Sequence, residues 1–409
     1  MLLLGAIISA SQHVVLTAES KPLLRMQTLP ATTPWNLNAL SKCPDFEWSE
    51  GTRVRSLFYK SELYKGKTTR VFAYYATPGT LSGDPSKDKN LPAIVLVHGG
   101  GGTAFAKWAE LWASRGYAAI AMDLSGSGPK RARLPDGGPR QTHDMIFGTI
   151  NQPVTEQWSY HAVANVIRAH SLIRSFPEVD TDRTAVTGIS WGGYLTCIVA
   201  GIDSRFKAAV PVYGCGFLHE NSVWLNEFAK MSTEHRAKWT QLWDPCMYVG
   251  CATMPMLFVN GGTDFAYPPD SYAKTYSLVQ SPKNIRFVPT LQHGHIFDRP
   301  KAIEVFIKHH IDTGLPLARI TSLKADKDQV KANVDSKTKL VKAELHYTLD
   351  ALPGNPKTRK WVTQPGTIKK HNIIADLPPP NATIWFLTVE DERNTLVSSK
   401  LMFPLAGAN

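Results

Sequence analysis

The sequence of 409 residues contains only five cysteines and no long hydrophobic run. Five cysteines are too few for a disulfide framework in a chain of this length, and none stands with histidines at the spacing of a zinc site. No apolar segment is long enough to span a bilayer. The sequence also has no internal repeat and no low-complexity segment. These absences exclude a small disulfide-stabilised domain, a zinc finger, a membrane-spanning protein and a repeat protein, and they leave a globular chain with at least one large core.

Acidic residues are fewer than basic ones, with 34 Asp and Glu against 45 Lys and Arg and a net charge of +11. A positive surface can attract acidic polysaccharides or other anionic surfaces over long distances. The lysines are scattered, however, and in their densest stretch, residues 324–342, they alternate with aspartates. This pattern is typical of a solvated strand face, so we predict no nucleic-acid partner. The oligomeric state stays open.

The first ten residues, MLLLGAIISA, form an apolar stretch that ends in small residues, as in a signal peptide, although no Lys or Arg precedes it. We predict that residues 1–42 are a leader and that the protein is secreted or periplasmic, with a cytoplasmic location as the alternative. Cys246 and Cys251 are close enough in sequence to form a disulfide in an exported protein. The favoured alternative is that all five cysteines are buried as small hydrophobic side chains.

Apolar strands alternate with helical segments between residues 91 and 311, after two antiparallel strands predicted at 54–59 and 69–75. This alternation predicts an α/β fold, in which helices cover both faces of a mostly parallel sheet. Two long segments, near 125–154 and 217–250, interrupt the alternation where such sheets bind ligands. We predict that they form a lid and the walls of a substrate site.

The helical pattern ends after Gly314, and strand patterns follow to the end of the chain. We predict a catalytic domain at residues 43–315 and a small β-sandwich domain at 316–409. The second domain has no catalytic constellation. Carbohydrate binding and packing against the first domain are both compatible with its pattern, and packing is favoured. Residues 78–90, rich in Pro, Gly and Asp, predict a surface loop.

The most informative motif is Gly-Ile-Ser-Trp-Gly-Gly at residues 188–193. A short apolar strand precedes it and a helical segment follows it, so Ser190 would stand on a sharp strand-to-helix turn, the nucleophile elbow. A serine hydroxyl is a poor nucleophile unless it is exposed next to a base. Gly188 and Gly192 fit this turn because the chain segments approach closely there. We predict that Ser190 is a nucleophile.

A serine nucleophile needs a base and an acid that orients the base. Asp264 follows the apolar strand at 256–259 in a turn rich in Gly and Pro, and it is the predicted acid. His293 and His295 follow the next strand. We favour His293 as the base because its offset from the strand end suits the chain order Ser, Asp, His, and His295 is the second candidate. The residues predicted to line the substrate pocket are His295, Tyr267 and Trp224.

Acyl transfer also requires hydrogen-bond donors for the oxyanion of the tetrahedral intermediate. One predicted donor is the backbone N–H of Trp191, directly after the nucleophile. The other is expected in the glycine-rich stretch after the strand at 93–97, where Gly99, Gly100 and Gly101 are the candidates. No Walker or dinucleotide-binding pattern accompanies these glycines. We therefore predict neither an organic cofactor nor a metal.

Together these motifs resemble the dienelactone hydrolase, acetyl xylan esterase and prolyl oligopeptidase-related branch of the α/β-hydrolases. The resemblance covers about residues 50–315 and is carried by the segments 97–102, 179–183, 188–193, 261–269 and 293–295. It implies an α/β-hydrolase fold with Ser190 as nucleophile, Asp264 as acid and His293 as base. Dienelactone hydrolases use a cysteine where this chain has Ser190. Oligopeptidases carry a large propeller where only a short segment precedes the glycine-rich stretch here.

The residues and the resemblance predict a serine hydrolase, more specifically a carboxylesterase that acts on short-chain acyl esters. Acetyl groups on carbohydrate are the expected substrates, as in acetyl xylan esterases, so the expected partner is a small-molecule or carbohydrate ester. An oligopeptidase-like serine peptidase is one alternative. A non-catalytic carbohydrate-binding protein is the other.

Overall fold

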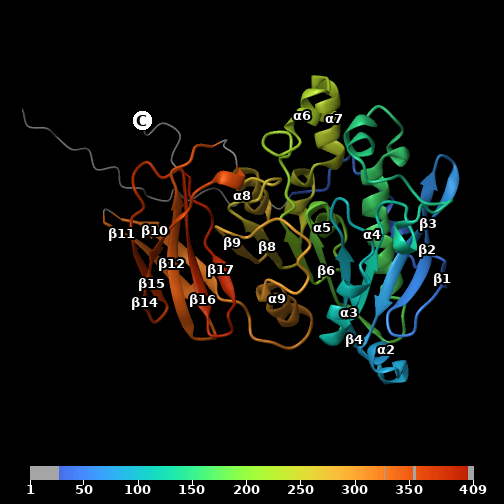
Figure 1. The fold of residues 1–409 in the computed structure, drawn as a ribbon, viewed down its shortest axis with the longest axis horizontal. Helices are drawn as coiled ribbons and strands as arrows, with labels where there is room; N and C mark the ends of the chain where they lie inside the picture. The colour runs from blue at the N-terminus through green and yellow to red at the C-terminus, as the bar shows by residue number, and fades with distance from the viewer. Residues whose placement is uncertain (1–26, 327, 353–355, 404–409) are drawn as a thin grey trace, which may run out of the picture.

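The computed structural model describes residues 27–326, 328–352 and 356–403 (Figure 1). The apolar stretch predicted as a signal peptide, residues 1–10, lies outside the described residues. Part of the predicted leader, residues 27–42, already lies on the folded body. There Trp35 is 5% exposed and its indole N–H donates to the carbonyl oxygen of Tyr160 at 2.9 Å. Within the described ranges, no helix combines the length and apolar composition needed to cross a membrane.

The secondary structure follows the predicted alternation closely. The strands are β1 Phe46–Trp48, β2 Arg55–Tyr64, β3 Lys67–Ala76, β4 Leu91–Val97, β5 Ala118–Met122, β6 Val179–Ile189, β7 Ala208–Val212, β8 Met256–Gly261, β9 Lys283–Val288, β10 Arg319–Ala325, β11 Gln329–Asp335, β12 Leu340–Thr348, β13 Val362–Pro365, β14 Thr367–Lys369, β15 Asn372–Asp376, β16 Ile384–Asp391 and β17 Leu396–Ser398. The α-helices are α1 Leu37–Leu40, α2 Pro78–Ser82, α3 Ala106–Ser114, α4 Trp158–Ile173, α5 Trp191–Ile202, α6 Leu225–Ala229, α7 Thr233–Trp243, α8 Pro269–Leu278 and α9 Lys301–Ile311. Single 3-10 or π turns are η1 Pro85–Lys87, η2 Pro129–Arg131, η3 Asp144–Gly148, η4 Val154–Glu156, η5 Pro245–Met247, η6 Val249–Cys251 and η7 Pro356–Thr358.

One large sheet runs through the molecule in the order β1-β2-β3-β5-β4-β6-β7-β8-β9-β17-β16-β12-β13. Neighbouring strands from β5 to β9 are parallel, whereas β1, β2 and β3 pair antiparallel. Helices α4, α5 and α8 cover one face of the parallel part, and α3 and α9 cover the other. This confirms the predicted fold class. The carboxyl ends of the parallel strands therefore lie along one edge, where α/β sheets bind ligands.

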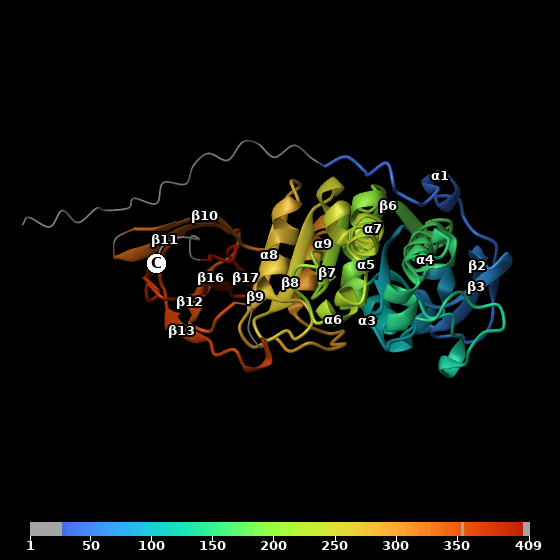
Figure 2. The same cartoon turned by 90° about the horizontal axis from the view of Figure 1, so that it is seen from above.

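The predicted β-sandwich is present beside the end of this sheet (Figure 2). Its second sheet has the order β10-β11-β15-β14, and it packs on β12 and β13 of the first. The first sheet is shared with the α/β part of the chain, because β17 pairs antiparallel with β9 through Ser398 and Ile285. The edge of β9 is thus covered by a strand, which removes an open sheet edge. The domain boundaries at 42 and 315 stay predictions.

The two insertions pack on each other above the carboxyl ends of the strands. The indole N–H of Trp239, from α7 in the second insertion, donates to the carbonyl oxygen of Ile146 in the first at 2.9 Å. The rings of Phe147 and Trp239 stack with centroids 5.4 Å apart. Both tryptophans of α7, Trp239 and Trp243, are fully buried. These tryptophans therefore pack the insertion rather than line a substrate site.

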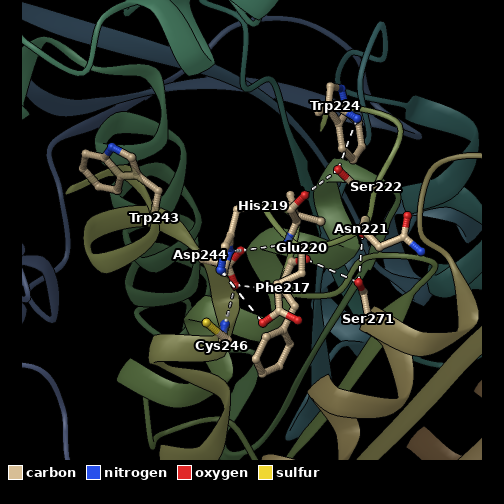
Figure 3. A network of polar contacts seen from close by, with 12 residues as sticks. Phe217, His219, Glu220, Asn221, Ser222, Trp224, Trp243, Asp244, Cys246 and Ser271 are labelled. Atoms are coloured by element: carbon tan, nitrogen blue, oxygen red, sulfur yellow. Dashed lines mark hydrogen bonds and ion pairs between the residues drawn. The ribbon is translucent and has the colours of Figure 1, made fainter. Parts of the chain in front are cut away.

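Asp244 fixes the two ends of the second insertion (Figure 3). Its side chain is fully buried and accepts backbone N–H groups of Phe217 at 2.8 Å, Leu218 at 3.0 Å and Cys246 at 2.9 Å. A buried carboxylate requires such donors to replace its hydration. The neighbouring Cys246 is a free thiol, as is Cys251, so the two do not form a disulfide in this structure.

The segment 78–90, predicted as a loop, contains the helix α2 and the turn η1. Thr77 and Thr80 form a reciprocal capping box at the start of α2, with Pro78 in the first turn. Gly83 ends the helix in a left-handed conformation at φ 82°. These are strong helix start and stop signals. The high Pro and Gly content concealed them in the sequence.

Candidate active site

Ser190 stands between the end of β6 and the start of α5 with φ 60° and ψ −120°. A non-glycine residue at positive φ is strained, and such strain is held in place by surrounding structure at functional sites. The flanking glycines leave no room for a side chain. A Cβ on Gly188 would lie 2.1 Å from the carbonyl oxygen of Gly192, and one on Gly192 would lie 1.9 Å from that of Val97. The close approach expected at these two positions is therefore present.

The structure brings Ser190, Asp264 and His293 together in one hydrogen-bonded chain. His293 Nε2 lies 2.8 Å from Ser190 Oγ, and His293 Nδ1 lies 2.8 Å from Asp264 Oδ2. With its Nδ1 proton donated to the carboxylate, the imidazole presents Nε2 as an acceptor to the serine hydroxyl. Three strands supply these residues, since β6 leads to Ser190, β8 to Asp264 and β9 to His293. Between His293 and His295, the geometry selects His293 as the candidate base.

Asp264 and His293 are each held by further contacts. Asp264 is fully buried, and its Oδ1 accepts the backbone N–H groups of Ala266 at 2.8 Å and Tyr267 at 2.9 Å. The His293 ring packs against two aromatic rings, with centroids 4.6 Å from Tyr213 and 4.8 Å from Phe265. The Tyr213 hydroxyl donates to the carbonyl oxygen of Gln292 at 2.7 Å, which fixes the loop just before the base. Sequence analysis did not identify Tyr213 or Phe265, although Phe265 directly follows the acid.

The oxyanion donors differ in part from those predicted. The N–H of Trp191 opens α5, where the first N–H groups of a helix have no partner within the helix and the helix dipole is positive. The N–H of Gly99, however, donates to His295 Nε2 at 3.1 Å. Gly101 is exposed and does not line the cavity at Ser190. Gly100 lines that cavity, so the predicted set of three glycines is revised to Gly100.

The glycine-rich loop is organised by two histidines. Since His295 Nε2 accepts a backbone N–H, its ring is neutral with the proton on Nδ1. Burial, and to a lesser extent the nearby His98, lowers the pKa of His295 to about 4. His98 is buried, and its Nε2 accepts the backbone N–H of Leu124 at 2.9 Å. Its Nδ1 then donates to the carbonyl oxygen of Gly99 at 2.7 Å. Burial lowers the pKa of His98 as well. Both rings therefore stay neutral, and they hold residue Gly99 through its N–H and its carbonyl oxygen.

A cavity of about 230 Å³ opens directly on Ser190. Its lining residues are Gly100, Ile189, Ser190, Trp191, Trp224, Phe265, Ala266, His293, Gly294 and His295. Of the residues predicted for the pocket, His295 and Trp224 line it. Tyr267 lies behind the wall, fully buried, with its ring centroid 5.2 Å from that of Trp224. Among the described residues, no cluster of three or more His, Cys, Asp or Glu side chains has the arrangement of a metal site.

The chain matches two family models. One describes acetyl xylan esterase and matches residues 39–230, and the other describes the prolyl oligopeptidase family and matches residues 150–312. Both matches contain the nucleophile elbow. The second also contains Asp264 and His293.

Curated relatives include esterases and peptidases. The chain is 23% identical over 244 residues to acetyl esterase Axe7A of Xylanibacter ruminicola, a match that covers 56% of this chain and 55% of the relative. It is 22% identical over 248 residues to the probable dipeptidyl-peptidase 5 of Aspergillus flavus, which covers 56% of this chain and 31% of the relative. The chain thus spans between 31% and 55% of the length of these two relatives.

Solved structures show the same fold. An acetyl xylan esterase from Paenibacillus sp. R4 matches with a TM-score of 0.54 at 25% identity, over 67% of this chain and 92% of that one. Acetyl xylan esterase 1 from Thermoanaerobacterium sp. JW/SL YS485 matches with a TM-score of 0.53 at 20% identity, over 71% and 98%. With Ser190 joined to His293 and His293 to Asp264, the chain has an α/β-hydrolase fold with the hydrogen-bonded arrangement of a serine hydrolase site, and it is similar to the branch that contains the acetyl xylan esterase and prolyl oligopeptidase families.

Proposed function

We propose that this protein hydrolyses carboxylic esters with short acyl groups, and that acetyl groups on carbohydrate are its substrates. The observation that carries the proposal is the cavity of about 230 Å³ at Ser190, which lies below the usual range of roughly 300–1,000 Å³ for ligand pockets. Trp191, Trp224 and Phe265 form apolar walls next to the nucleophile. Such a space suits a small acyl group, whereas the larger alcohol part of the ester would extend from the cavity mouth.

The geometry supports a two-step acyl transfer. Ser190 Oγ attacks the ester carbonyl while His293 Nε2 takes its proton, and Asp264 stabilises the resulting imidazolium. The N–H groups of Trp191 and Gly100 stabilise the oxyanion of the tetrahedral intermediate. The intermediate collapses with loss of the alcohol, which receives its proton from His293. Water, activated by His293, then attacks the acyl-enzyme and releases the carboxylic acid and free Ser190.

The chemistry of the cavity favours an ester over a peptide with a free amino terminus. A substrate ammonium group would need a carboxylate partner at the site. The described residues that line the cavity include neither Asp nor Glu. Two relatives with esterase names, acetyl esterase Axe7A and the Paenibacillus acetyl xylan esterase, are consistent with this choice. The match to the prolyl oligopeptidase family makes a peptidase the second candidate.

The first experiment compares the wild type with Ser190→Ala on p-nitrophenyl acetate, butyrate and octanoate, and then on acetylated xylan. We expect turnover that is fastest on acetate and absent in the variant. Aminoacyl and dipeptidyl arylamides are tested in parallel. Faster, Ser190-dependent cleavage of an arylamide would replace the esterase proposal with a peptidase. Failure of Ser190 to react with a fluorophosphonate probe would indicate a non-catalytic carbohydrate-binding protein.

We also propose a secreted or periplasmic location, which rests on the apolar stretch at residues 1–10. The intact mass of the protein purified from its native host tests this. A mature chain that begins within residues 11–34, before the buried Trp35, is expected. A chain that retains Met1 would contradict cleavage of the leader.

A further inference from the structure

Trp361 of the β-sandwich lies against the loop that carries the candidate acid. It follows η7 and precedes β13, and its indole packs on Gly262, which is two residues before Asp264. A Cβ added to Gly262 would lie 2.4, 2.5 and 2.7 Å from three atoms of this indole, which are its three nearest atoms. Gly262 is buried and does not have a positive φ. The indole itself, rather than the backbone conformation, therefore requires glycine here.

The same indole also reaches the strand that leads to the candidate base. Its ring centroid lies 6.1 Å from that of Phe287, the penultimate residue of β9, and 5.4 Å from that of Phe386 in β16. Both phenylalanines are fully buried. The two catalytic loops are joined at this point, because the N–H of Gly262 donates to the carbonyl oxygen of Val288 at 2.8 Å. Trp361 thus packs where the loop of Asp264 meets the loop of His293.

Trp361 contacts Gly262 and the two phenylalanines by van der Waals packing and not by hydrogen bonds. The Trp361 indole N–H is buried and has no hydrogen-bond partner among the described residues. Burial of a polar group without a partner is unfavourable, so packing must hold the ring in place. The same sandwich segment also reaches the cavity mouth, where the ammonium of Lys357 lies 4.9 Å from the ring centroid of Phe265. Phe265 lines the cavity and contacts the His293 ring.

We propose that Trp361 is a positioning residue for hydrolysis at Ser190, and that the β-sandwich thereby contributes to the active site. By filling the space between Gly262, Phe287 and Phe386, the indole fixes the separation of the two loops that supply Asp264 and His293. The inference rests on the proposed function, because it uses turnover at Ser190 as its readout. The proposal gives the β-sandwich a role in catalysis in addition to packing against the end of the parallel sheet.

The test is a double-mutant cycle in the full chain, with Trp361→Ala, Gly262→Ala and the two combined. Misplacing catalytic groups by about 1 Å costs on the order of 10²-fold, so each single variant should lose roughly 10- to 100-fold in kcat for p-nitrophenyl acetate. KM should change much less, because the cavity walls remain. In the double variant the new methyl group no longer meets an indole. The double variant should therefore lose as much kcat as Trp361→Ala alone, and its loss should be smaller than the product of the two single losses.

Two further variants separate positioning from general stability. Trp361→Phe keeps a flat apolar ring and should recover most of kcat. Trp385→Ala removes an indole from β16 of the same sandwich; because side chains alternate along a strand, it leaves the face of Phe386 untouched. It should lower the melting temperature but keep kcat. Equal kcat losses in Trp361→Ala and Trp385→Ala, or a multiplicative loss in the double variant, would overturn the proposal.

Labelling of Ser190 by a fluorophosphonate probe gives a readout that does not depend on the natural substrate. Its rate should fall in Trp361→Ala in parallel with kcat. If the wild type labels quickly but hydrolyses no ester, the proposed function fails while the positioning role is still tested by the labelling rates. If Trp361→Ala remains folded and labels at the wild-type rate, the positioning role itself is wrong.

Discussion

His295 Nε2 accepts the backbone N–H of Gly99 at 3.1 Å, across 196 positions of sequence. This bond withdraws Gly99 from the set of oxyanion donors and fixes the His98–Gly99 peptide, which directly precedes the peptide that carries the Gly100 N–H. A Cβ on Gly99 would lie 2.8 Å from Ser190 Cβ, so the fixed peptide lies directly beside the nucleophile. The second histidine of the His-Gly-His sequence therefore supports the oxyanion loop while the first faces the serine.

Removing the acceptor at position 295 should impair turnover. In His295→Ala the buried N–H of Gly99 loses its partner and the loop can reorient, so Gly100 no longer presents its N–H in a fixed direction. Loss of one oxyanion donor costs about 10²–10³ in kcat, and we expect a loss of roughly 10-fold or more here. Steady-state kinetics on p-nitrophenyl acetate measure this. His295→Gln, which keeps an acceptor, should lose less; wild-type kcat in His295→Ala would exclude this role.

Replacing the acid should reduce activity more strongly than it reduces stability. Asp264→Asn retains an oxygen for the N–H groups of Ala266 and Tyr267 but presents an amide to His293. The imidazole is then held in the wrong tautomer, which in serine hydrolases costs on the order of 10⁴ in kcat. Thermal unfolding should show a change of only a few degrees. An Asp264→Asn enzyme within 10-fold of the wild type would mean that another group orients the base.

Tyr267→Phe should make the protein more stable and less active. The Tyr267 hydroxyl is fully buried without a hydrogen-bond partner of good geometry among the described residues. Removing an unsatisfied buried hydroxyl should stabilise the fold by about 1 kcal/mol. Burial raises the pKa of Tyr267, so its hydroxyl stays neutral, and the Tyr267 ring is stacked near that of His293 with centroids 6.2 Å apart. Loss of the hydroxyl from this neighbour of the base should lower kcat. A less stable Tyr267→Phe variant would show that the hydroxyl has a stabilising partner.

Acid should destabilise the protein between about pH 6.5 and pH 4. Burial lowers the pKa of several histidines in the folded state, to about 4 for His170, His295, His310 and His346. The unfolded chain, with histidine pKa values near 6.5, binds protons more readily across this window. The stability contributed by these neutral rings is therefore complete above about pH 6.5 and is lost as the pH falls toward 4.

Urea unfolding at several pH values between 8 and 4.5 measures this dependence. His346 provides the control, because it lies in the sandwich between Thr363 and Thr388, away from Ser190. His346→Gln removes one titrating ring, so its unfolding free energy should fall less steeply with acid than that of the wild type. Equal slopes in the two proteins would show that His346 does not contribute.

The types and spacing of neighbouring residues made most of the candidate active-site residues predictable from the sequence. The elbow was visible because Gly188 and Gly192 flank Ser190 at a fixed spacing, and a close approach of backbone admits only glycine there. Asp264 and His293 were visible because each follows an apolar strand in the expected order. The small helix α2 was missed because its capping box occurs in a segment rich in turn residues.

The sequence by itself determined the nucleophile elbow, the chain order of Ser190, Asp264 and His293, and the alternation of strands and helices, since these depend on neighbouring residues and on side-chain periodicity. Only the tertiary structure decided which histidine faces Ser190, which glycine N–H donates to His295 instead of to the oxyanion, and how β17 joins β9. It also placed Trp361 against Gly262. These features depend on contacts between residues far apart in the chain, such as His295 and Gly99, and no local pattern encodes which distant groups meet.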